Sequence, residues 1–285
     1  MRHIQRIVGL GVGVVLAACA LGSTPALASG SPSCTYDSGT RQVTVTHDTA
    51  GTPLTVGVDP ISPAGWYGAI YVTDGTNTAW CAGLAHTDRI VIKAATPAAY
   101  QHTVIDERTG DFGPGATKES TGLSEIEISV LTGTGGDQLT VMQFSAGRRD
   151  VRLRTSPTSL SLGPEIDLNG DGDYDLGMTQ AGLVKVVGTG GADRIDASAV
   201  STFPVQLHGG VGADVLIGGT RNDTLYANGT STYFGDHESD LLFGGAGADT
   251  LSAKDDSADS VYGGADYDGA QVDPADTTVS VERLF

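Results

Sequence analysis

A nine-residue pattern of glycine, aspartate and one large apolar residue recurs between Gly188 and Gln271. Two copies are complete, Gly209-Gly-Val-Gly-Ala-Asp-Val-Leu-Ile217 and Gly244-Gly-Ala-Gly-Ala-Asp-Thr-Leu-Ser252. Self-similarity at a fixed period means that each repeat is one structural unit, which buries its apolar residue only by stacking on neighbouring units. Six residues of turn and three of strand make half a coil of a flattened roll, so two repeats complete one coil.

The residue types of the turn favour a metal ion. Glycine permits the positive φ angles and the close backbone approach that a Cβ would obstruct. The turn carbonyls and the aspartate side chain face outward and together supply the six or more hard oxygen atoms that calcium prefers. Glycine and aspartate also mark ordinary solvated turns, but a phased series with regular apolar residues favours calcium.

Degenerate copies are placed by following the apolar position. It falls at Ile195, Leu207, Leu216, Leu225, Phe234, Leu242, Leu251, Val261, Ala270 and Val279. The aspartate two places earlier is then Asp193, Asp214, Asp223, Asp240, Asp249, Asp259 or Asp268. Val205, Thr232 and Thr277 stand at that place before Leu207, Phe234 and Val279, and no aspartate there can complete a site.

Successive repeats lie on opposite sides of the roll, so an ion between stacked turns needs aspartate in one repeat and in the next but one. This condition predicts four pairs: Asp193 with Asp214, Asp223 with Asp240, Asp240 with Asp259, and Asp249 with Asp268.

The two complete copies resemble the Gly-Gly-x-Gly-x-Asp-x-U-x repeat of the RTX (repeats-in-toxin) family, where U is a large apolar residue. That resemblance implies a calcium-binding β-roll over residues 188–285. Phe112-Gly-Pro-Gly-Ala-Thr117, together with Ser124-Glu-Ile-Glu-Ile-Ser-Val130, is similar to a pattern of secreted actinobacterial calcium-binding proteins. It implies that residues 29–187 form an irregular β-solenoid rather than a separate globular domain.

Composition and pattern upstream of the repeats also predict strands. Short alternating segments rich in Thr and Val are separated by Gly, Pro, Asn and Asp, and none has a sustained helical period. Asp137 and Leu139 read as one early degenerate nonapeptide. We therefore expect an all-β chain, a right-handed parallel β-solenoid ending in a calcium-binding β-roll, with the handedness following from the rule for parallel crossovers.

The first 28 residues predict export. Arg2 and Arg6 precede an apolar run, and Ala26-Leu27-Ala28 is a small-x-small cleavage site, as in a signal peptide. The run is too short for a transmembrane helix. A second interpretation stays open, because Leu16-Ala17-Ala18-Cys19 resembles a bacterial lipobox whose Cys19 would be lipidated.

Export leaves Cys34 and Cys81 as an even pair in an oxidising compartment, where a disulfide is the default. The alternative is two separate buried thiols.

A second metal candidate is Asp167-Leu-Asn-Gly-Asp-Gly-Asp-Tyr-Asp175. Oxygen ligands alternate, and Gly172 stands where an EF-hand loop needs its turn. Met178 occupies the place of the bidentate glutamate and the flanks are not helical, so the loop resembles the shorter loop of dockerin-like modules and needs a distant carboxylate. The predicted ligands are Asp167, Asn169, Asp171 and Asp175, with Asp173 acting mainly through its backbone; an exposed acidic turn is the alternative.

A formal charge of −18, or −20 once Arg2 and Arg6 are removed, argues against nucleic acid and anionic membranes as partners. The chain has no zinc-protease helix and no nucleophile elbow, and Arg152 and Arg154 are expected to form salt bridges on one strand face. We predict a non-catalytic structural, surface or interaction protein that folds on binding extracellular calcium, with a polysaccharide or protein as its partner. The alternative is a small polysaccharide-active β-helix enzyme of lyase or epimerase type.

Overall fold

The computed structural model describes residues 31–47, 52–60, 68–95, 100–113, 125–132, 136–143, 149–157, 163–229 and 237–285. Within these ranges the chain is all-β, with 23 strands and one 3-10 turn at Leu84–His86. None of the described segments is a helix long and apolar enough to cross a membrane. The predicted signal peptide, Cys19, Thr232 and Phe234 lie outside the described residues.

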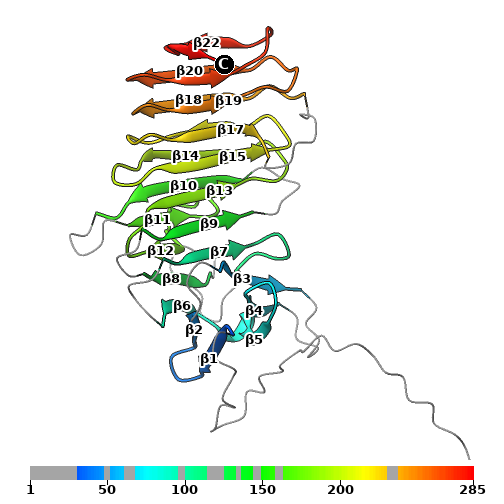
Figure 1. The fold of residues 1–285 in the computed structure, drawn as a ribbon. Coiled ribbons are helices and arrows are strands. Elements are labelled where there is room, and N and C mark those ends of the chain that lie inside the picture. Colours follow the sequence, from blue (N-terminus) through cyan, green and yellow to red (C-terminus); the bar gives the residue numbers. More distant parts are fainter. Residues whose placement is uncertain are drawn as a thin grey trace, which may run out of the picture.

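The strands form two sheets, here named sheet A and sheet B. Sheet A has 12 strands: β1 (Ser33–Asp37), β2 (Gln42–His47), β6 (Arg89–Ala94), β8 (Glu127–Leu131), β12 (Leu176–Met178), β11 (Pro164–Asp167), β10 (Asp150–Thr155), β14 (Arg194–Ala199), β16 (Val215–Ile217), β18 (Leu241–Ala246), β20 (Ser260–Ala265) and β22 (Thr277–Val279). Sheet B has 11 strands: β5 (Thr78–Gly83), β4 (Ala69–Thr73), β3 (Leu54–Asp59), β7 (His102–Asp106), β9 (Gln138–Met142), β13 (Leu183–Val187), β15 (Val205–Gly210), β17 (Thr224–Asn228), β19 (Thr250–Ser252), β21 (Gly269–Gln271) and β23 (Arg283–Leu284). Figure 1 shows these strands stacked along one axis, with β1 to β5 at one end and β22 beside the C terminus at the other.

In the repeat region consecutive strands alternate between the sheets, and each pairs in parallel with the next strand of its own sheet. Two repeats therefore make one coil, as the nine-residue pattern predicts. The side chains of Leu216, Leu225, Leu242, Leu251 and Val261 are fully buried, which confirms their predicted inward direction.

The predicted register is wrong after Leu225. Leu216 pairs directly with Leu242, and Leu225 with Leu251, so no strand corresponding to Phe234 stands between them in either sheet. The aspartates before these residues are separated by 26 positions, against 18 to 21 for the other coils. The additional separation is close to the length of one repeat. The longer connection between β17 and β18 therefore has the spacing of one more repeat in the sequence.

The register is also shifted by one residue at the C-terminal end. Val261 pairs with Thr278, and Val279 is 46% exposed. The nine-residue spacing predicts Val279 at the apolar position, but the backbone register places the polar Thr278 beside Val261.

Parallel pairing continues into the N-terminal half, where antiparallel strands interrupt it in three places. β1 pairs with β2, β4 joins β3 and β5, and the β11–β12 hairpin is inserted between β8 and β10. The disulfide Cys34–Cys81 joins β1 of sheet A to β5 of sheet B, with 5.6 Å between the Cα atoms. The predicted disulfide is thus confirmed, and it links the two sheets at the N-terminal end of the stack.

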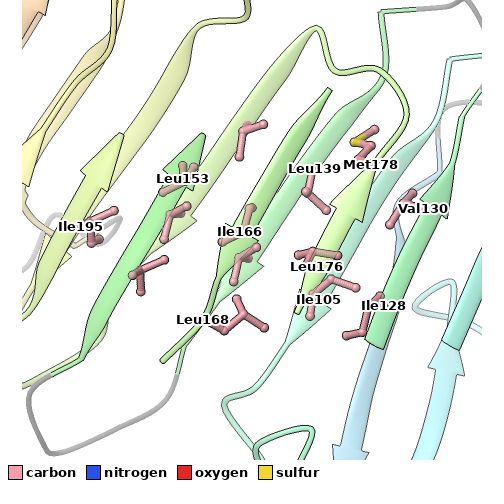
Figure 2. Packing of buried hydrophobic residues seen from close by; sticks show 14 of the residues in the cluster. Ile105, Ile128, Val130, Leu139, Leu153, Ile166, Leu168, Leu176, Met178 and Ile195 are labelled. Carbon is pink, nitrogen blue, oxygen red and sulfur yellow. The ribbon is translucent and has the colours of Figure 1, made fainter. Parts of the chain in front are cut away.

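One continuous apolar core runs between the sheets. Figure 2 shows side chains of sheet A, including Ile128, Leu153, Ile166 and Leu176, together with Ile105 and Leu139 of sheet B. All of these are at most 1% exposed. Because the β11–β12 hairpin buries its apolar residues in this core, its connecting loop is held in a fixed position at the edge of the stack.

Candidate calcium-binding site

Seven aspartates stand immediately before strands of the repeat region and form what we call the aspartate ladder. On sheet A they are Asp193, Asp214, Asp240 and Asp259, and on sheet B they are Asp223, Asp249 and Asp268. All seven residues are 0–4% exposed. Asp and Glu are rarely buried to this degree unless they are paired or bind a metal.

One carboxylate oxygen of each ladder aspartate fixes the neighbouring coil. On sheet A the backbone N–H of Asp193 donates to Asp214 Oδ1 at 2.7 Å, that of Asp214 to Asp240 Oδ1 at 2.7 Å, and that of Asp240 to Asp259 Oδ1 at 2.8 Å. On sheet B the N–H of Asp223 donates to Asp249 Oδ1 at 2.7 Å, and that of Asp249 to Asp268 Oδ1 at 2.8 Å. Each accepting aspartate therefore binds the backbone N–H of the aspartate at the same position in the preceding coil. This hydrogen bond specifies the stacking register.

In three of the ladder aspartates the second carboxylate oxygen is left for another ligand, whereas Oδ2 of Asp223 accepts the N–H of Gly219 at 2.6 Å. Oδ2 of Asp249, Asp259 and Asp268 is buried and has no hydrogen-bond partner among the described residues. A buried carboxylate oxygen without a partner costs free energy, because it has lost its hydration shell.

The first glycine of the repeat keeps open the space beside this oxygen. A Cβ on Gly244 would lie against Asp249 Oδ2 and the carbonyl oxygen of Gly263. The same atom on Gly209 would meet Asp214 Oδ2 and the carbonyl oxygen of Ala227. Carboxylate and carbonyl oxygens therefore converge on a position that only glycine leaves free, and this donor set fits calcium.

Burial also disfavours the charged form of these groups in the metal-free chain. It raises the pKa of Asp193 and of Asp223 to about 6, and that of Asp249 to about 7, with the charges of Asp223 and Asp268 adding to the effect at Asp249. Like charges in a desolvated column repel one another, so the ladder favours either protons or a cation.

Three of the four predicted aspartate pairs are stacked neighbours: Asp193 with Asp214, Asp240 with Asp259, and Asp249 with Asp268. The predicted pair Asp223 with Asp240 is wrong, because these residues precede strands of opposite sheets. The stack instead places Asp214 beside Asp240 and Asp223 beside Asp249.

Further acidic residues extend the ladder. Asp259 N–H donates to Asp276 Oδ1 at 3.0 Å, and Asp268 N–H donates to Glu282 Oε2 at 2.7 Å. Glu282 could have been predicted, because it stands two places before the apolar Leu284. Asp276 could not, because it stands two places before Thr278 rather than two places before Val279. At the other end, Asp137 Oδ1 accepts the N–H of Gln101 at 2.8 Å, so the early nonapeptide contains an aspartate of the same kind.

Asp255 is the third acidic side chain that the sequence did not single out. Its carboxylate lies with those of Asp240 and Asp259 in a group whose oxygens are within 4.8 Å of one another, and all three residues are buried. It also accepts hydrogen bonds from Asn228 Nδ2 at 2.9 Å and from Ser257 N–H at 2.8 Å. Asp255 precedes no apolar residue at the repeat spacing, and therefore the pattern could not identify it.

The loop Asp167–Asp175 connects two strands rather than two helices. Asp167 accepts the N–H of Gly170 at 2.6 Å and that of Gly172 at 3.0 Å, and Asn169 Oδ1 accepts that of Asp171 at 2.8 Å. The structure brings Asn169 and Asp175 beside Glu125, while Asp171 is exposed and its Oδ1 accepts the N–H of Asp173. Calcium binding by the predicted ligands of this loop stays a prediction.

Residues 208–231 and 234–269 match the family model of the RTX calcium-binding nonapeptide repeat, in four copies. Searches of curated proteins and of solved structures returned no significant match. Such repeats bind calcium ions, in agreement with the oxygen-rich turns described above. Residues 208–231 and 234–269 are therefore RTX-type calcium-binding nonapeptide repeats.

Proposed function

We propose that the chain is exported and that its repeat region, residues 188–285, closes into a right-handed β-roll when calcium outside the cell fills the aspartate ladder. RTX calcium-binding proteins are typically extracellular, and the N-terminal sequence has the order of a signal peptide. The folded roll would serve as a structural, surface or interaction module for an extracellular polysaccharide or protein.

The observation that carries this proposal is the double use of ladder aspartates such as Asp249 and Asp268. In Asp249 and Asp268, Oδ1 accepts the N–H of the preceding coil while Oδ2 stays buried without a hydrogen-bond partner among the described residues. The geometry that brings the carboxylates together exists only when the coils are stacked. Bound calcium supplies the positive charge that this column of carboxylates lacks, and free energy of binding to a site that exists only in the folded state is free energy of folding.

The magnitude is large enough to decide the fold. With a dissociation constant of about 10⁻⁴ M, typical of extracellular calcium modules, and calcium near 10⁻³ M, each site stabilises the folded state by about 1.4 kcal/mol. Four sites contribute about 6 kcal/mol, against a total stability of about 5–15 kcal/mol for an ordinary domain. At the much lower calcium concentration of the cytosol the sites would be almost empty, and the acidic chain would stay unfolded for export.

The test is circular dichroism and hydrogen exchange of the mature chain, first in excess chelator and then during a calcium titration. Amides of residues 241–271 are expected to exchange rapidly in chelator and slowly in calcium. The disulfide-linked segment 31–106 serves as an internal comparison and should change less. Protection of residues 241–271 in chelator would mean that the roll is self-sufficient and that calcium does not drive its folding.

The proposal assigns no catalytic role to the chain, in keeping with RTX repeats being generally non-catalytic. The basic cluster gives partial support to this assignment, because Arg154 pairs with Glu165 at 2.5 Å and lies 3.6 Å from the ring centroid of Tyr174. The alternative of a polysaccharide-active enzyme is tested by incubating polyuronides with the protein, with and without calcium. Turnover under either condition would replace the present proposal.

A further inference from the structure

A cavity of about 230 Å³ lies at the junction between the irregular half of the stack and the β11–β12 hairpin. Four segments that are distant in the sequence line it: the turn after β7, the approach to β8, the approach to β10, and the hairpin loop. Its polar lining consists of Glu107, Asp111, Glu125, Arg149, Asn169 and Asp175. Phe112, Ile126 and Leu168 supply the apolar part of its wall.

Negative charge dominates this cavity. Four of the lining residues carry carboxyl groups, and the single arginine, Arg149, is already paired with Asp111 at 2.6 Å. Three carboxyl groups, those of Glu107, Glu125 and Asp175, therefore face the space without a cationic side chain of their own.

Glu125 brings two of the loop residues together. Its Oε1 accepts a hydrogen bond from Asn169 Nδ2, and its carboxyl group is hydrogen-bonded to that of Asp175. The second oxygen of Asp175, Oδ2, accepts the N–H of Leu168 at 2.9 Å. Two carboxylates at hydrogen-bonding distance repel each other unless a proton or a cation lies between them.

Glu107 gives an independent indication of a ligand. It comes from the turn after β7 rather than from the hairpin loop, and it is only 3% exposed. Its carboxyl group accepts hydrogen bonds from Gln143 and from the N–H of Phe112, but Oε2 is buried with no hydrogen-bond partner among the described residues. A buried oxygen with an unused lone pair that lines a polar cavity is a ready ligand for a cation or for a water bound to one.

We propose that this cavity binds one hydrated calcium ion between the carboxylates of Glu107, Glu125 and Asp175, with Asn169 beside them; because the oxygens of these three carboxylates do not all lie within 4.8 Å of one another, at least one carboxylate reaches the ion through a bound water. A water molecule takes up about 30 Å³ of liquid, so the cavity has room for an ion and several waters. Ligands from three separate segments suit the flexible coordination of calcium by six to eight oxygens better than the near-ideal octahedron that magnesium demands.

This site is distinct from the aspartate ladder, since none of its ligands belongs to a nonapeptide repeat. It also differs from an EF-hand-like loop that encircles its ion, because Asp171 and Asp173 are not among the residues lining the cavity. Its ligands come from the connection after β7, the approach to β8 and the inserted hairpin. A bound ion would therefore fasten the hairpin to the stack at the point where parallel pairing in sheet A is interrupted.

The experiment counts calcium ions bound to the full mature chain by native mass spectrometry during a calcium titration. The variant E107Q/E125Q keeps the size of both side chains and removes two ligand charges, and it is expected to bind one ion fewer than the wild type at saturation. The matched control E127Q loses a charge two residues further along the segment, outside the cavity lining, and is expected to bind the full number. An unchanged count in E107Q/E125Q, or an equal loss in E127Q, would overturn the site.

Hydrogen exchange of residues 164–178 provides a second measurement. Calcium should slow exchange there in the wild type and in E127Q, and no longer do so in E107Q/E125Q. If the double variant does not fold, E107Q alone gives the same test, because it leaves the Glu125–Asn169 hydrogen bond in place. Absence of a calcium effect on residues 164–178 in the wild type contradicts the site, whereas insensitivity of residues 241–271 to calcium contradicts the proposed function, so the two failures are distinguishable.

Discussion

The substitution Asp249→Asn separates the two uses of a ladder aspartate. Oδ1 of Asp249 accepts the N–H of Asp223 at 2.7 Å, and an asparagine amide oxygen can make the same hydrogen bond. What the substitution removes is the negative charge of a 2% exposed side chain that stands near the charges of Asp223 and Asp268. We therefore expect the sign of its effect on stability to depend on calcium.

Without calcium, at pH 8, the variant loses a desolvated charge that repels its neighbours, so the fraction of its repeat region that is folded should equal or exceed that of the wild type. In 1 mM calcium it loses a ligand. Each site contributes about 1.4 kcal/mol at a dissociation constant near 10⁻⁴ M. Because Asp249 is stacked between Asp223 and Asp268, one or two sites are affected, and the expected loss is about 1.4–2.8 kcal/mol.

The assay is circular dichroism, which gives the folded signal in chelator and follows urea unfolding in 1 mM calcium. Asp256→Asn is the matched control, since it removes the same charge from an exposed residue whose positive φ of 68° asparagine tolerates. The control should behave like the wild type in both conditions. An equal loss of stability for Asp249→Asn in chelator and in calcium would refute the reasoning, because the residue would then act only through its folded-state hydrogen bonds.

Three further outcomes are expected. Burial and neighbouring carboxylates raise the pKa of Asp249 to about 7, so the folded metal-free chain binds protons more tightly than the unfolded chain. Its stability should therefore fall as the pH rises from about 4 to about 7. A calcium-stripped protein with a higher melting temperature at pH 8 than at pH 5 would contradict this. Gly244→Ala places a methyl group against Asp249 Oδ2, so it should cost about 1–3 kcal/mol in urea unfolding in 1 mM calcium and weaken calcium binding in the mass-spectrometric titration. Gly177→Ala is the control, because no atom lies within 4 Å of the new Cβ, and it should change stability by less than about 1 kcal/mol in the same unfolding assay. Cys34→Ser/Cys81→Ser opens a loop of 47 residues and should lower stability by about 4 kcal/mol, with exchange of residues 241–271 in calcium unchanged; loss of protection there would show that the two ends of the stack fold as one unit.

The sequence predicted the parts of the fold that depend on local chemistry. The apolar residues Leu216, Leu242 and Val261 could be assigned to the interior because each stands two places after an aspartate, and all three are fully buried. The stacking partners could not be predicted so well, because they depend on the length of the connections between strands. The connection between β17 and β18 is longer by almost one repeat, so the nine-residue spacing continues across it although it contributes no strand to either sheet. Each later strand is therefore one place earlier in the stack than the spacing predicts, and Asp223 is stacked with Asp249 and not with Asp240.

The limits of prediction for the candidate sites have the same origin. Asp167 and Asn169 are recognisable because neighbouring residues in the chain make a loop of known type. Glu107 follows β7 and Glu125 precedes β8, and only the insertion of the β11–β12 hairpin between β8 and β10 brings them to that loop. The sequence indicated that a distant carboxylate was needed, but it contained no signal that identified which one.

The direction of the ladder hydrogen bonds has a consequence for how the repeats depend on one another. The N–H of Asp223 donates to Asp249, and the N–H of Asp249 donates to Asp268, so every rung is held by a carboxylate that follows it in the sequence. The last rungs are held by Asp276 and Glu282, which lie outside the nonapeptide matches. A repeat therefore acquires its full set of contacts only after the next coil has been added, and stability is transmitted between nearest neighbours, as in other solenoids. Because the same carboxylates also supply the oxygens for calcium, the register of the coils and the affinity for the ion depend on one set of side chains, and a change such as Asp249→Asn separates them only because the amide oxygen keeps the register hydrogen bond while the ligand charge is lost.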